Sequence, residues 1–358
     1  VCVPLPHAVH RGVDGSDMYK WLHRIWYEGG KSYQVLLPLS GIYWLLITLR
    51  RCLYGMGILG RHRAIVPVII VGNITAGGTG KTPVTIWLTR ELRERGFNPG
   101  IVSRGYGGSR SDSSMRVDRA SDPGVVGDEP VLLARRTGCP VVVDSNRARA
   151  AQMLVDDGVN VIVADDGLQH YRLERTYEIC VIDGARGLGN RFLLPAGPLR
   201  ETVDRLSEVD QVLVNGRINE DAEHTTAVEQ NAIAFELVAN EVSRLNGSLT
   251  RPIEGFAGTT VHGVAAIGNP GRFFDMLRAH GMQVIEHAFQ DHARLNPDDL
   301  KFGDDFEVLM TEKDAVKIDS AVSDKYWTVP VDLYIEPVIS GPWLEQIESR
   351  LQDELGSQ

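Results

Sequence analysis

A glycine-rich segment after an apolar run constrains this chain more than any other feature. Residues 66–82 read V-P-V-I-I-V-G-N-I-T-A-G-G-T-G-K-T, in which the β-branched run 68–71 leads into a loop that ends in Gly80-Lys81-Thr82 before a helical pattern. Glycines let backbone N–H groups turn toward phosphate oxygens, a helix N-terminus adds its positive dipole end, and a lysine adds charge. The order of strand, loop and helix predicts a P-loop on a parallel α/β sheet.

The loop departs from the strict P-loop pattern at its first position. The glycine expected five residues before Gly80 is Thr75, and Gly77 and Gly78 lie inside the loop instead. An ordinary glycine-rich turn with a coincidental G-K-T is the alternative, and we favour phosphate binding. The residues predicted to bind the nucleotide phosphates are Thr75, Ala76, Gly77, Gly78, Thr79, Gly80, Lys81 and Thr82. The Thr82 hydroxyl is also a candidate ligand of Mg²⁺.

Length, charge and cysteine usage limit the class of protein. The chain has 358 residues, which is long for one compact domain and favours two α/β domains. Its net charge of −10 argues against a general affinity for nucleic-acid phosphates. The cysteines are scattered without C-x-x-C or framework spacing, which favours free thiols in a reducing compartment over a structural zinc site. They are Cys2, Cys52, Cys139 and Cys180.

The front of the chain contains a polar stretch and then an uncharged apolar run. Residues 1–17 show neither apolar periodicity nor a signal-peptide core, so we expect a disordered extension and hypothesise that translation naturally starts at Met18. Residues 35–49 carry no charge and are shorter than the ~20 residues that span a bilayer comfortably. We prefer a membrane-associated helix, and a buried core helix remains the alternative.

A membrane-associated helix at 35–49 would have interfacial anchors. Tyr43 and Trp44 are expected at the headgroup level of the bilayer. The basic residues expected to meet anionic lipid on the cytoplasmic face are Arg50, Arg51, Arg61 and Arg63. The sequence leaves open whether the run spans the membrane or lies on it.

Two loops after the P-loop helix carry candidate site residues. A second buried strand is predicted at 98–103 and leads into S-R-G-Y-G-G, where Arg104 could meet a phosphate and Tyr106 could cover a base or sugar; an exposed glycine turn is the alternative. Asp128 and Glu129 of G-D-E-P could hold Mg²⁺ or accept a proton from an attacking hydroxyl. Taken alone, they fit better a helix N-terminus capped by Asp128.

An acidic pair ends the apolar run 159–166. The sequence V-N-V-I-V-A-D-D places Asp165 and Asp166 at a strand tip, which is the Walker B arrangement beside a P-loop. An isolated turn is the alternative, but the upstream G-K-T favours a functional pair. Gln169 and His170 follow on the same loop and extend the predicted site.

Together the motifs resemble those of the tetraacyldisaccharide 4'-kinases of lipid A biosynthesis. The resemblance covers the chain from about Met18 onward, and Thr75 in place of glycine fits this family's loop. It is carried by V-G-N-I-T-A-G-G-T-G-K-T-P (71–83), S-R-G-Y-G-G (103–108), G-D-E-P (127–130), A-D-D-G-L-Q-H-Y-R-L (164–173), L-P-A-G-P-L-R-E (194–201), D-H (291–292) and M-T-E-K-D-A-V-K (310–317).

The resemblance implies a lipid kinase that uses ATP and Mg²⁺. The enzyme would move the γ-phosphoryl of ATP to the 4'-hydroxyl of a tetraacyldisaccharide 1-phosphate, giving lipid IVA, at the cytoplasmic face of a Gram-negative inner membrane. It would require no nucleic acid, and no obligate protein partner is evident. A membrane-peripheral P-loop ATPase switch of the partition or targeting type is the alternative function. A nucleotide-gated interaction protein without catalysis is a further one.

The resemblance also assigns roles to individual residues. Asp128 looks like the general base and His292 like the partner that orients it, which promotes Asp128 from a helix cap. The other residues that the resemblance places at the phosphates or the acceptor are Lys81, Arg200, Arg147, Gln169, His170 and Tyr106. The candidates for Mg²⁺ and its waters are Thr82, Glu129, Asp165 and Asp166. The T-E-K-D segment at 311–314 is predicted to cap a helix, without a catalytic role.

We expect four sections along the chain. The fold class is a P-loop NTPase-type parallel sheet domain with a second, smaller α/β domain and an N-terminal membrane-associated helical segment. The expected bounds are 1–17 for the extension, 18–63 for the helical segment, 64–215 for the nucleotide-binding domain and 216–358 for the second domain with its C-terminal helix.

Overall fold

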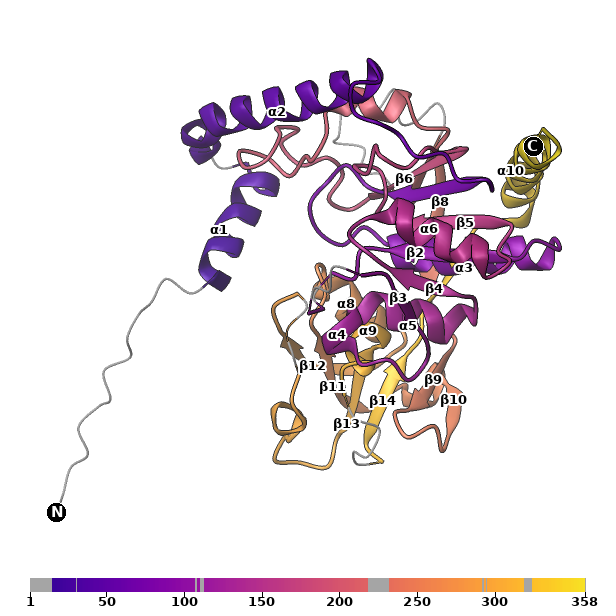
Figure 1. The fold of residues 1–358 in the computed structure, drawn as a ribbon. Helices are drawn as coiled ribbons and strands as arrows, with labels where there is room; N and C mark the ends of the chain where they lie inside the picture. The colour runs from indigo at the N-terminus through magenta and orange to yellow at the C-terminus, as the bar shows by residue number, and fades with distance from the viewer. Residues whose placement is uncertain are drawn as a thin grey trace.

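The computed structural model of the chain contains two β-sheets, each packed against helices (Figure 1). It describes residues 15–29, 31–106, 108–109, 113–217, 232–291, 293, 295–318 and 324–357. The α/β class and the mainly parallel nucleotide-binding sheet predicted from the sequence are confirmed. His292, assigned to the base pair, lies outside the described residues, as do residues 1–14 of the expected extension; the backbone of 15–17 already belongs to a helix.

The first sheet has nine strands in the order β15-β8-β7-β6-β1-β5-β2-β4-β3. The terminal strands β3 and β15 run antiparallel to their neighbours, and the other pairs are parallel. The strands are β1 Val68–Gly72, β2 Pro99–Ser103, β3 Met115–Val117, β4 Val141–Val143, β5 Val161–Asp165, β6 Tyr177–Asp183, β7 Gln211–Asn215, β8 Ala232–Val238 and β15 Asp332–Tyr334. The P-loop strand β1 therefore lies at the centre, between β6 and β5.

Alternation along β1 divides the core of this sheet into two faces. Val68 and Ile70 pack on one face, whereas Ile69 and Val71 pack on the other, because successive side chains of a strand point in opposite directions. Both faces are covered, which explains why β1 is apolar at every position. Helix α6 (Arg147–Asp156) covers the first face, and α3 (Lys81–Glu94) and α10 (Pro337–Gly356) cover the second. Helices α4 (Pro123–Val126) and α5 (Asp128–Thr137) pack beside α3.

The second sheet has six strands in the order β10-β9-β14-β13-β11-β12. Its core surrounds the buried rings of Phe256, Phe274 and Trp327. The strands are β9 Glu241–Arg244, β10 Thr250–Pro252, β11 Thr260–Ala265, β12 Gln283–Ala288, β13 Glu307–Thr311 and β14 Tyr326–Val329. The helical elements are η3 Ile253–Phe256, α8 Pro270–Ala279, η4 Pro297–Leu300 and α9 Glu312–Ala315.

Part of the chain after residue 215 belongs to the first sheet. Strands β8 and β15 pair there, and α10 packs on it through a hydrogen bond from Trp343 Nε1 to the Tyr177 hydroxyl at 3.0 Å. The Trp87 and Trp343 rings stack at 5.7 Å between centroids. We therefore propose that the second domain is residues 239–331, and that the first domain resumes at β15.

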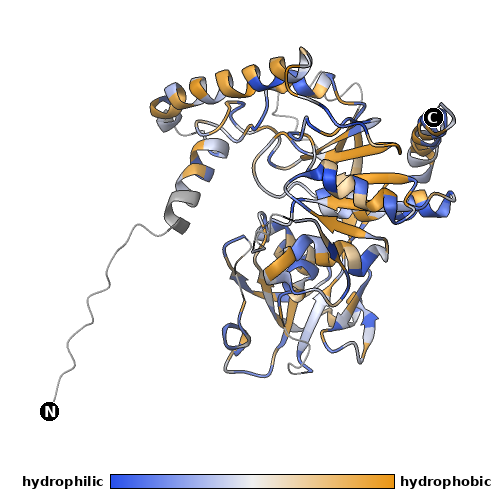
Figure 2. Ribbon diagram, viewed as in Figure 1, coloured by the Kyte–Doolittle hydropathy of each residue, from blue (hydrophilic) through white to orange (hydrophobic). Residues whose placement is uncertain are grey.

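The N-terminal segment forms α1 (Gly15–Tyr27), η1 (Lys31–Leu36) and α2 (Leu37–Gly55). Pro38 lies in the first turn of α2, where a missing N–H costs nothing, so it starts the helix rather than weakening it. Residues Ser32–Gly55 are long and apolar enough to cross a membrane. The exposed apolar side chains of α2 include Leu39, Ile42, Trp44, Leu45, Leu46 and Leu49. Figure 2 shows that most of this helix is coloured as hydrophobic. The buried core helix, the alternative interpretation, is thus wrong.

The inner side of α2 contacts the first domain. Ser40 Oγ donates to Leu193 O at 2.8 Å and the Tyr43 hydroxyl donates to Arg200 O at 3.0 Å. Arg51 pairs with Glu208 at 2.6 Å. Tyr43 and Arg51 were expected to face lipid, but both are turned toward the protein because carbonyl and carboxylate oxygens lie beneath this side of the helix.

Candidate active site

The P-loop connects β1 to α3 and uses its glycines where the backbone requires them. Gly77 and Gly80 both have φ of +101°, a conformation that favours glycine. A Cβ on Gly80 would lie 2.9 Å from Asn215 Nδ2. Thr75 has no positive φ and forms an antiparallel bridge with Leu199, so this position is extended and takes a side chain without strain. This explains the departure from the strict pattern.

The acidic pair at the end of β5 lies beside the P-loop lysine. Lys81 Nζ is 3.5 Å from Asp166 Oδ1, and Arg200 Nη1 is 3.3 Å from the same oxygen. The buried Arg147 donates through Nη2 to the carbonyl oxygens of Asp165 and Asp166, each at 2.8 Å. The structure thus brings together five predicted site residues, four of them from three separate motifs and the fifth, Arg147, assigned by the family resemblance.

Neighbouring groups separate the pKa values of the two aspartates. Burial, with the charges of Glu129 and Asp166, raises the pKa of Asp165 to about 7. Burial also opposes ionisation of Asp166, but Lys81 and Arg200 outweigh it and hold the pKa of Asp166 well below its usual range. Near neutral pH, Asp166 is therefore an anion, whereas the carboxyl group of Asp165 is present in both its protonated and its ionised form.

Two cavities meet at the P-loop. One, of about 470 Å³, lies between the two domains, and its walls include apolar side chains of both, such as Ile86 and Phe273. The other, of about 840 Å³, lies beneath α2 and is lined mostly by polar groups. Residues that border both are Gly78, Lys81, Glu129 and Lys313. The larger cavity gathers the predicted residues Arg104, Tyr106, Arg147, Gln169, His170 and Arg200.

The G-D-E-P carboxylates differ in position. Gly127, rather than Asp128, is the N-cap of α5, so the capping interpretation was wrong by one residue. Asp128 is the first residue of the helix, is 5% exposed and does not line either cavity. Its Oδ2 lies 3.4 Å from Lys317 Nζ, whereas Glu129 borders both cavities. Asp291, the neighbour of His292, lines the larger cavity.

Two lysines that the sequence analysis did not assign to the site come from the second domain. Lys313 Nζ lies 3.1 Å from Glu129 Oε1 and 3.4 Å from Asp291 Oδ1. Although burial opposes its charge, these carboxylates raise the pKa of Lys313 above its usual range, so it remains a cation. Thr311 caps α9 through the Asp314 N–H, as predicted. Both lysines contact carboxylates at the start of α5, and no sequence signal pointed to that contact, because Lys317 lies beyond the C-terminus of α9 and α5 is far away along the chain.

An arginine at the end of β6 joins the P-loop to the second domain. Arg186 donates to Gly78 O and, at 3.4 Å, to Gly268 O. Its partner Asp183 also accepts from Arg272 Nη2 at 2.9 Å. Asp183 ends a parallel strand next to β1, at the sheet edge where α/β folds bind ligands, and that position was a signal for this group.

Polar groups around the two cavities fit a phosphate-bearing ligand. Thr79 Oγ1, Arg147 Nε and His170 Nε2 are buried without a hydrogen-bond partner, and their residues line the cavities. Among the described residues, no group of three or more His, Cys, Asp or Glu side chains could hold a metal ion by itself. Mg²⁺ is commonly held by one or two carboxylates together with substrate phosphates, so the site fits it only alongside a nucleotide.

A P-loop, an acidic strand tip and a polar cavity that opens beside them define a P-loop phosphotransferase of the α/β class. Comparison with known proteins specifies it further. A family model described as Tetraacyldisaccharide-1-P 4'-kinase matches residues 32–351, and the chain belongs to this family. The family resemblance inferred from the motifs is confirmed. This membership does not favour the alternative of an ATPase switch.

Individual relatives agree with the family model. The chain is 49% identical over 302 residues to the tetraacyldisaccharide 4'-kinase of Alkalilimnicola ehrlichii, covering 84% of this chain and 88% of the relative. It is 44% identical over 319 residues to that of Nitrosococcus oceani, covering 89% and 91%. A crystal structure of LpxK from Aquifex aeolicus in complex with ATP is similar with a TM-score of 0.72 and 25% identity, covering 89% of this chain and 99% of that one.

Proposed function

We propose that this chain transfers the γ-phosphoryl of ATP to the 4'-hydroxyl of a tetraacyldisaccharide 1-phosphate and so forms lipid IVA. The observation that carries the proposal is the meeting of two cavities at Lys81. A nucleotide in the smaller, partly apolar cavity and an acceptor in the larger, polar one would face each other across this ammonium group. Such placement supplies the proximity on which phosphoryl transfer mainly depends.

On the donor side, the P-loop residues 75–82 would hold the phosphates through backbone N–H groups. Lys81 would exchange Asp166 for a phosphate oxygen, because the two attractions compete for one ammonium group. Thr82, Glu129, Asp165 and Asp166 would hold Mg²⁺ together with the nucleotide. The ion would neutralise charge on the transferring phosphoryl group.

On the acceptor side, Arg104, Tyr106, Arg147, Gln169, His170 and Arg200 would bind the sugar and its phosphates. Asp128 is proposed as the base, with His292 as its partner. Because Asp128 is buried beside Lys317, this role requires the hydroxyl to enter as far as the start of α5. A sugar hydroxyl loses its proton late in a loose transition state, so the base has a modest task.

The acceptor is a lipid, and α2 supplies the surface that would meet it. Its exposed leucines, isoleucine and tryptophan fit the lipid of the inner membrane at its cytoplasmic face. The larger cavity opens beneath the same helix through Tyr43 and Arg50, so a disaccharide anchored by its acyl chains could enter without leaving the bilayer.

Acceptor-dependent ADP release tests the proposal. Purified protein with Mg-ATP should release ADP only when an acylated disaccharide phosphate is added in mixed micelles, with one phosphorylated lipid formed per ADP. Lys81→Ala should lower kcat at least about a hundredfold, because it removes charge from the phosphate cradle. Hydrolysis that ignores the lipid would contradict the kinase and favour a switch, and near wild-type turnover of Lys81→Ala would contradict the P-loop assignment.

A further inference from the structure

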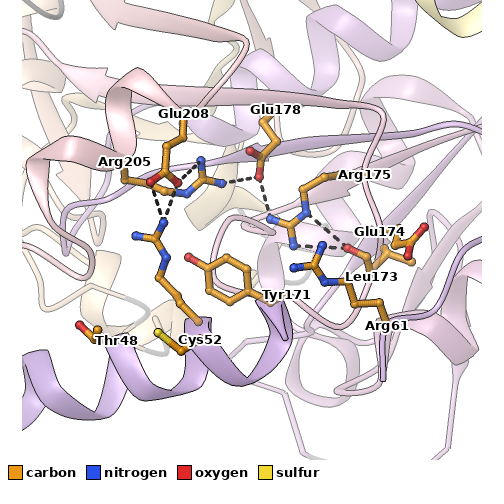
Figure 3. Close-up of a pocket in the computed structure, with 12 residues that line it drawn as sticks. Thr48, Cys52, Arg61, Tyr171, Leu173, Glu174, Arg175, Glu178, Arg205 and Glu208 are labelled. Carbon is orange, nitrogen blue, oxygen red and sulfur yellow. Dashed lines mark hydrogen bonds and ion pairs between the residues drawn. The ribbon is translucent and has the colours of Figure 1, made fainter. Parts of the chain in front are cut away.

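A network of charged side chains lies under α2, next to a cavity of about 800 Å³ (Figure 3). Its centre is Arg205, which is 3% exposed. We call it the Arg205 network, and its members are Arg51, Glu208, Arg205, Glu201, Glu178 and Arg175. Burial opposes the charge of Arg205, but hydrogen bonding to Glu178 and the carboxylates around it raise the pKa of Arg205, so this buried side chain is a cation.

The network begins on the membrane-facing helix. Arg51 Nη2 donates to both carboxylate oxygens of Glu208, at 2.7 and 2.6 Å. The same carboxylate lies 3.5 Å from Arg205 Nη1. Figure 3 shows Arg205 between Glu208 and Glu178. Both bonds come from one nitrogen of Arg51, and this charge-assisted contact ties α2 to Glu208 on the first domain.

One branch of the network reaches the acceptor cavity through side chains. Arg205 Nε lies 3.5 Å from Glu201 Oε2, an ion pair in which Nε makes no hydrogen bond. Glu201 Oε1 accepts from Gln169 Nε2 at 2.7 Å, and its other oxygen accepts from the Tyr171 hydroxyl. Gln169 Nε2 also donates to Asn73 O at 3.0 Å, immediately before the P-loop. This branch therefore fixes a residue that lines the acceptor cavity.

The second branch reaches the backbone of the same loop. Glu178 accepts from Arg205 and, at 2.7 Å, from Arg175 Nη1. Arg175 in turn donates to Leu168 O at 3.2 Å and to His170 O at 2.8 Å. Both branches thus end on residues 168–171, which carry Gln169 and His170 into the acceptor cavity.

We propose that Arg51 is a positioning residue for acceptor binding. Through Glu208 and Arg205, it sets the position of the loop that carries Gln169 and His170. Ion pairs inside the protein thereby link the position of α2 on a lipid surface to the shape of the acceptor cavity. This inference rests on the proposed function. It adds Arg51 on α2 to the residues that determine acceptor binding, beyond those that line the cavity.

The kinetics of Arg51→Ala test the proposal. The expected result is an about threefold to tenfold loss of kcat/KM for the lipid acceptor in mixed micelles, with KM for ATP unchanged. Arg51→Lys, which keeps the charge, should recover most of that loss. The matched control is Arg116→Ala, which breaks a bidentate surface pair with Asp157 outside the site and should change nothing.

A double-mutant cycle and hydrogen exchange separate positioning from a local effect. Glu208→Ala should cost as much as Arg51→Ala, and the double variant should cost no more than either, because the pair acts as one unit. Amide exchange of residues 168–171 should be faster in Arg51→Ala. Three results would each overturn the proposal. The first is acceptor kinetics of Arg51→Ala that equal those of Arg116→Ala, and the second is a double variant whose loss is the product of the two single losses. The third is unchanged amide exchange of residues 168–171 in Arg51→Ala. Exchange is measured without substrate, so it decides the matter even if wild-type protein shows no kinase activity.

Discussion

At the residue scale, Asp165 and Asp166 show how two adjacent carboxyl groups acquire different properties. Asp166 faces Lys81 and Arg200, while Asp165 is 1% exposed, accepts from Thr85 Oγ1 at 3.3 Å and lies near the charge of Glu129. The free protein therefore carries an acid whose ionised form is disfavoured by its surroundings.

Asp165→Asn should stabilise the free protein. The pKa of Asp165 is raised to about 7, above its unfolded value, so the folded state retains a proton that the unfolded state has lost. Stability therefore falls as pH rises from about 4 to about 7, and the penalty is complete above that window. Thermal unfolding without nucleotide or Mg²⁺ measures the gain in the free energy of unfolding that Asp165→Asn brings. This gain should be larger at pH 8 than at pH 5 by on the order of 2 kcal/mol. A gain that shrinks toward pH 8 would contradict the raised pKa of Asp165. The variant should also lose kinase activity, because Asp165 is proposed to help hold Mg²⁺.

Lys313→Ala should lower kcat at least about tenfold. The substitution leaves Glu129 and Asp291 without the cation between them, and their negative charge then faces the incoming phosphates. Steady-state kinetics with ATP and acceptor measure the effect. Lys301→Ala is the control, because that ammonium group pairs with Asp298 on the surface at 2.6 Å. Equal kinetics of the two variants would exclude Lys313 from the site.

The sequence predicted the site residues that belong to local motifs, such as Lys81 at the start of α3 and Asp165 at the end of β5. It did not predict Lys313 or Arg186, because their function depends on partners far away along the chain. Lys313 contacts Glu129 across 184 positions, and Arg186 contacts Gly78 across 108. A single sequence holds no record of such contacts. The roles given to Asp128 and His292 remain predictions.

At the element scale, α2 is a helix with two different sides. Its outer side exposes apolar groups, while its inner side places Ser40, Tyr43 and Arg51 on the first domain. The sequence predicted an apolar helix but not which side would face the protein. Short edge strands such as β3 and β15 escaped prediction because three residues carry too little periodicity.

Leu45→Glu with Leu46→Glu should weaken binding to anionic vesicles at least about tenfold, because two charges replace apolar groups at the lipid surface. The two side chains are 59% and 58% exposed, so the thermal midpoint should stay unchanged. Vesicle co-sedimentation and thermal unfolding measure the two effects. Gln152→Glu, at an exposed site of α6, controls for added charge. Undiminished vesicle binding would show that α2 is not the lipid-binding surface.

At the scale of the whole molecule, the smaller cavity, which we propose takes the nucleotide, forms where the two domains touch. Gly268 of the second domain lies against the P-loop, because a Cβ there would be 2.6 Å from Gly78 N. Arg186 donates to both loops. The sequence predicted two α/β units but not this contact, since neither glycine signals its partner.

Gly268→Ala should lower kcat at least about tenfold and also lower the thermal midpoint, because the added Cβ meets backbone rather than a flexible side chain. The methyl group would push the P-loop away from the second domain, and misplaced reacting groups are costly in phosphoryl transfer. Turnover and thermal unfolding measure the result. Gly303→Ala is the matched control, since a Cβ there meets nothing within 4 Å. If both variants turn over alike, the contact between the domains has no part in catalysis.

The pairing of β8 with β15 has a consequence for how the chain is assembled. Val238 and Asp332 are direct partners across this antiparallel pair. The polypeptide thus leaves the first sheet and returns to it at adjacent points, as in a β-hairpin whose turn has been replaced by a complete domain. Under the proposed bounds, residues 239–331 are an insertion between two paired strands, and this pairing anchors both ends of the second domain to the first sheet.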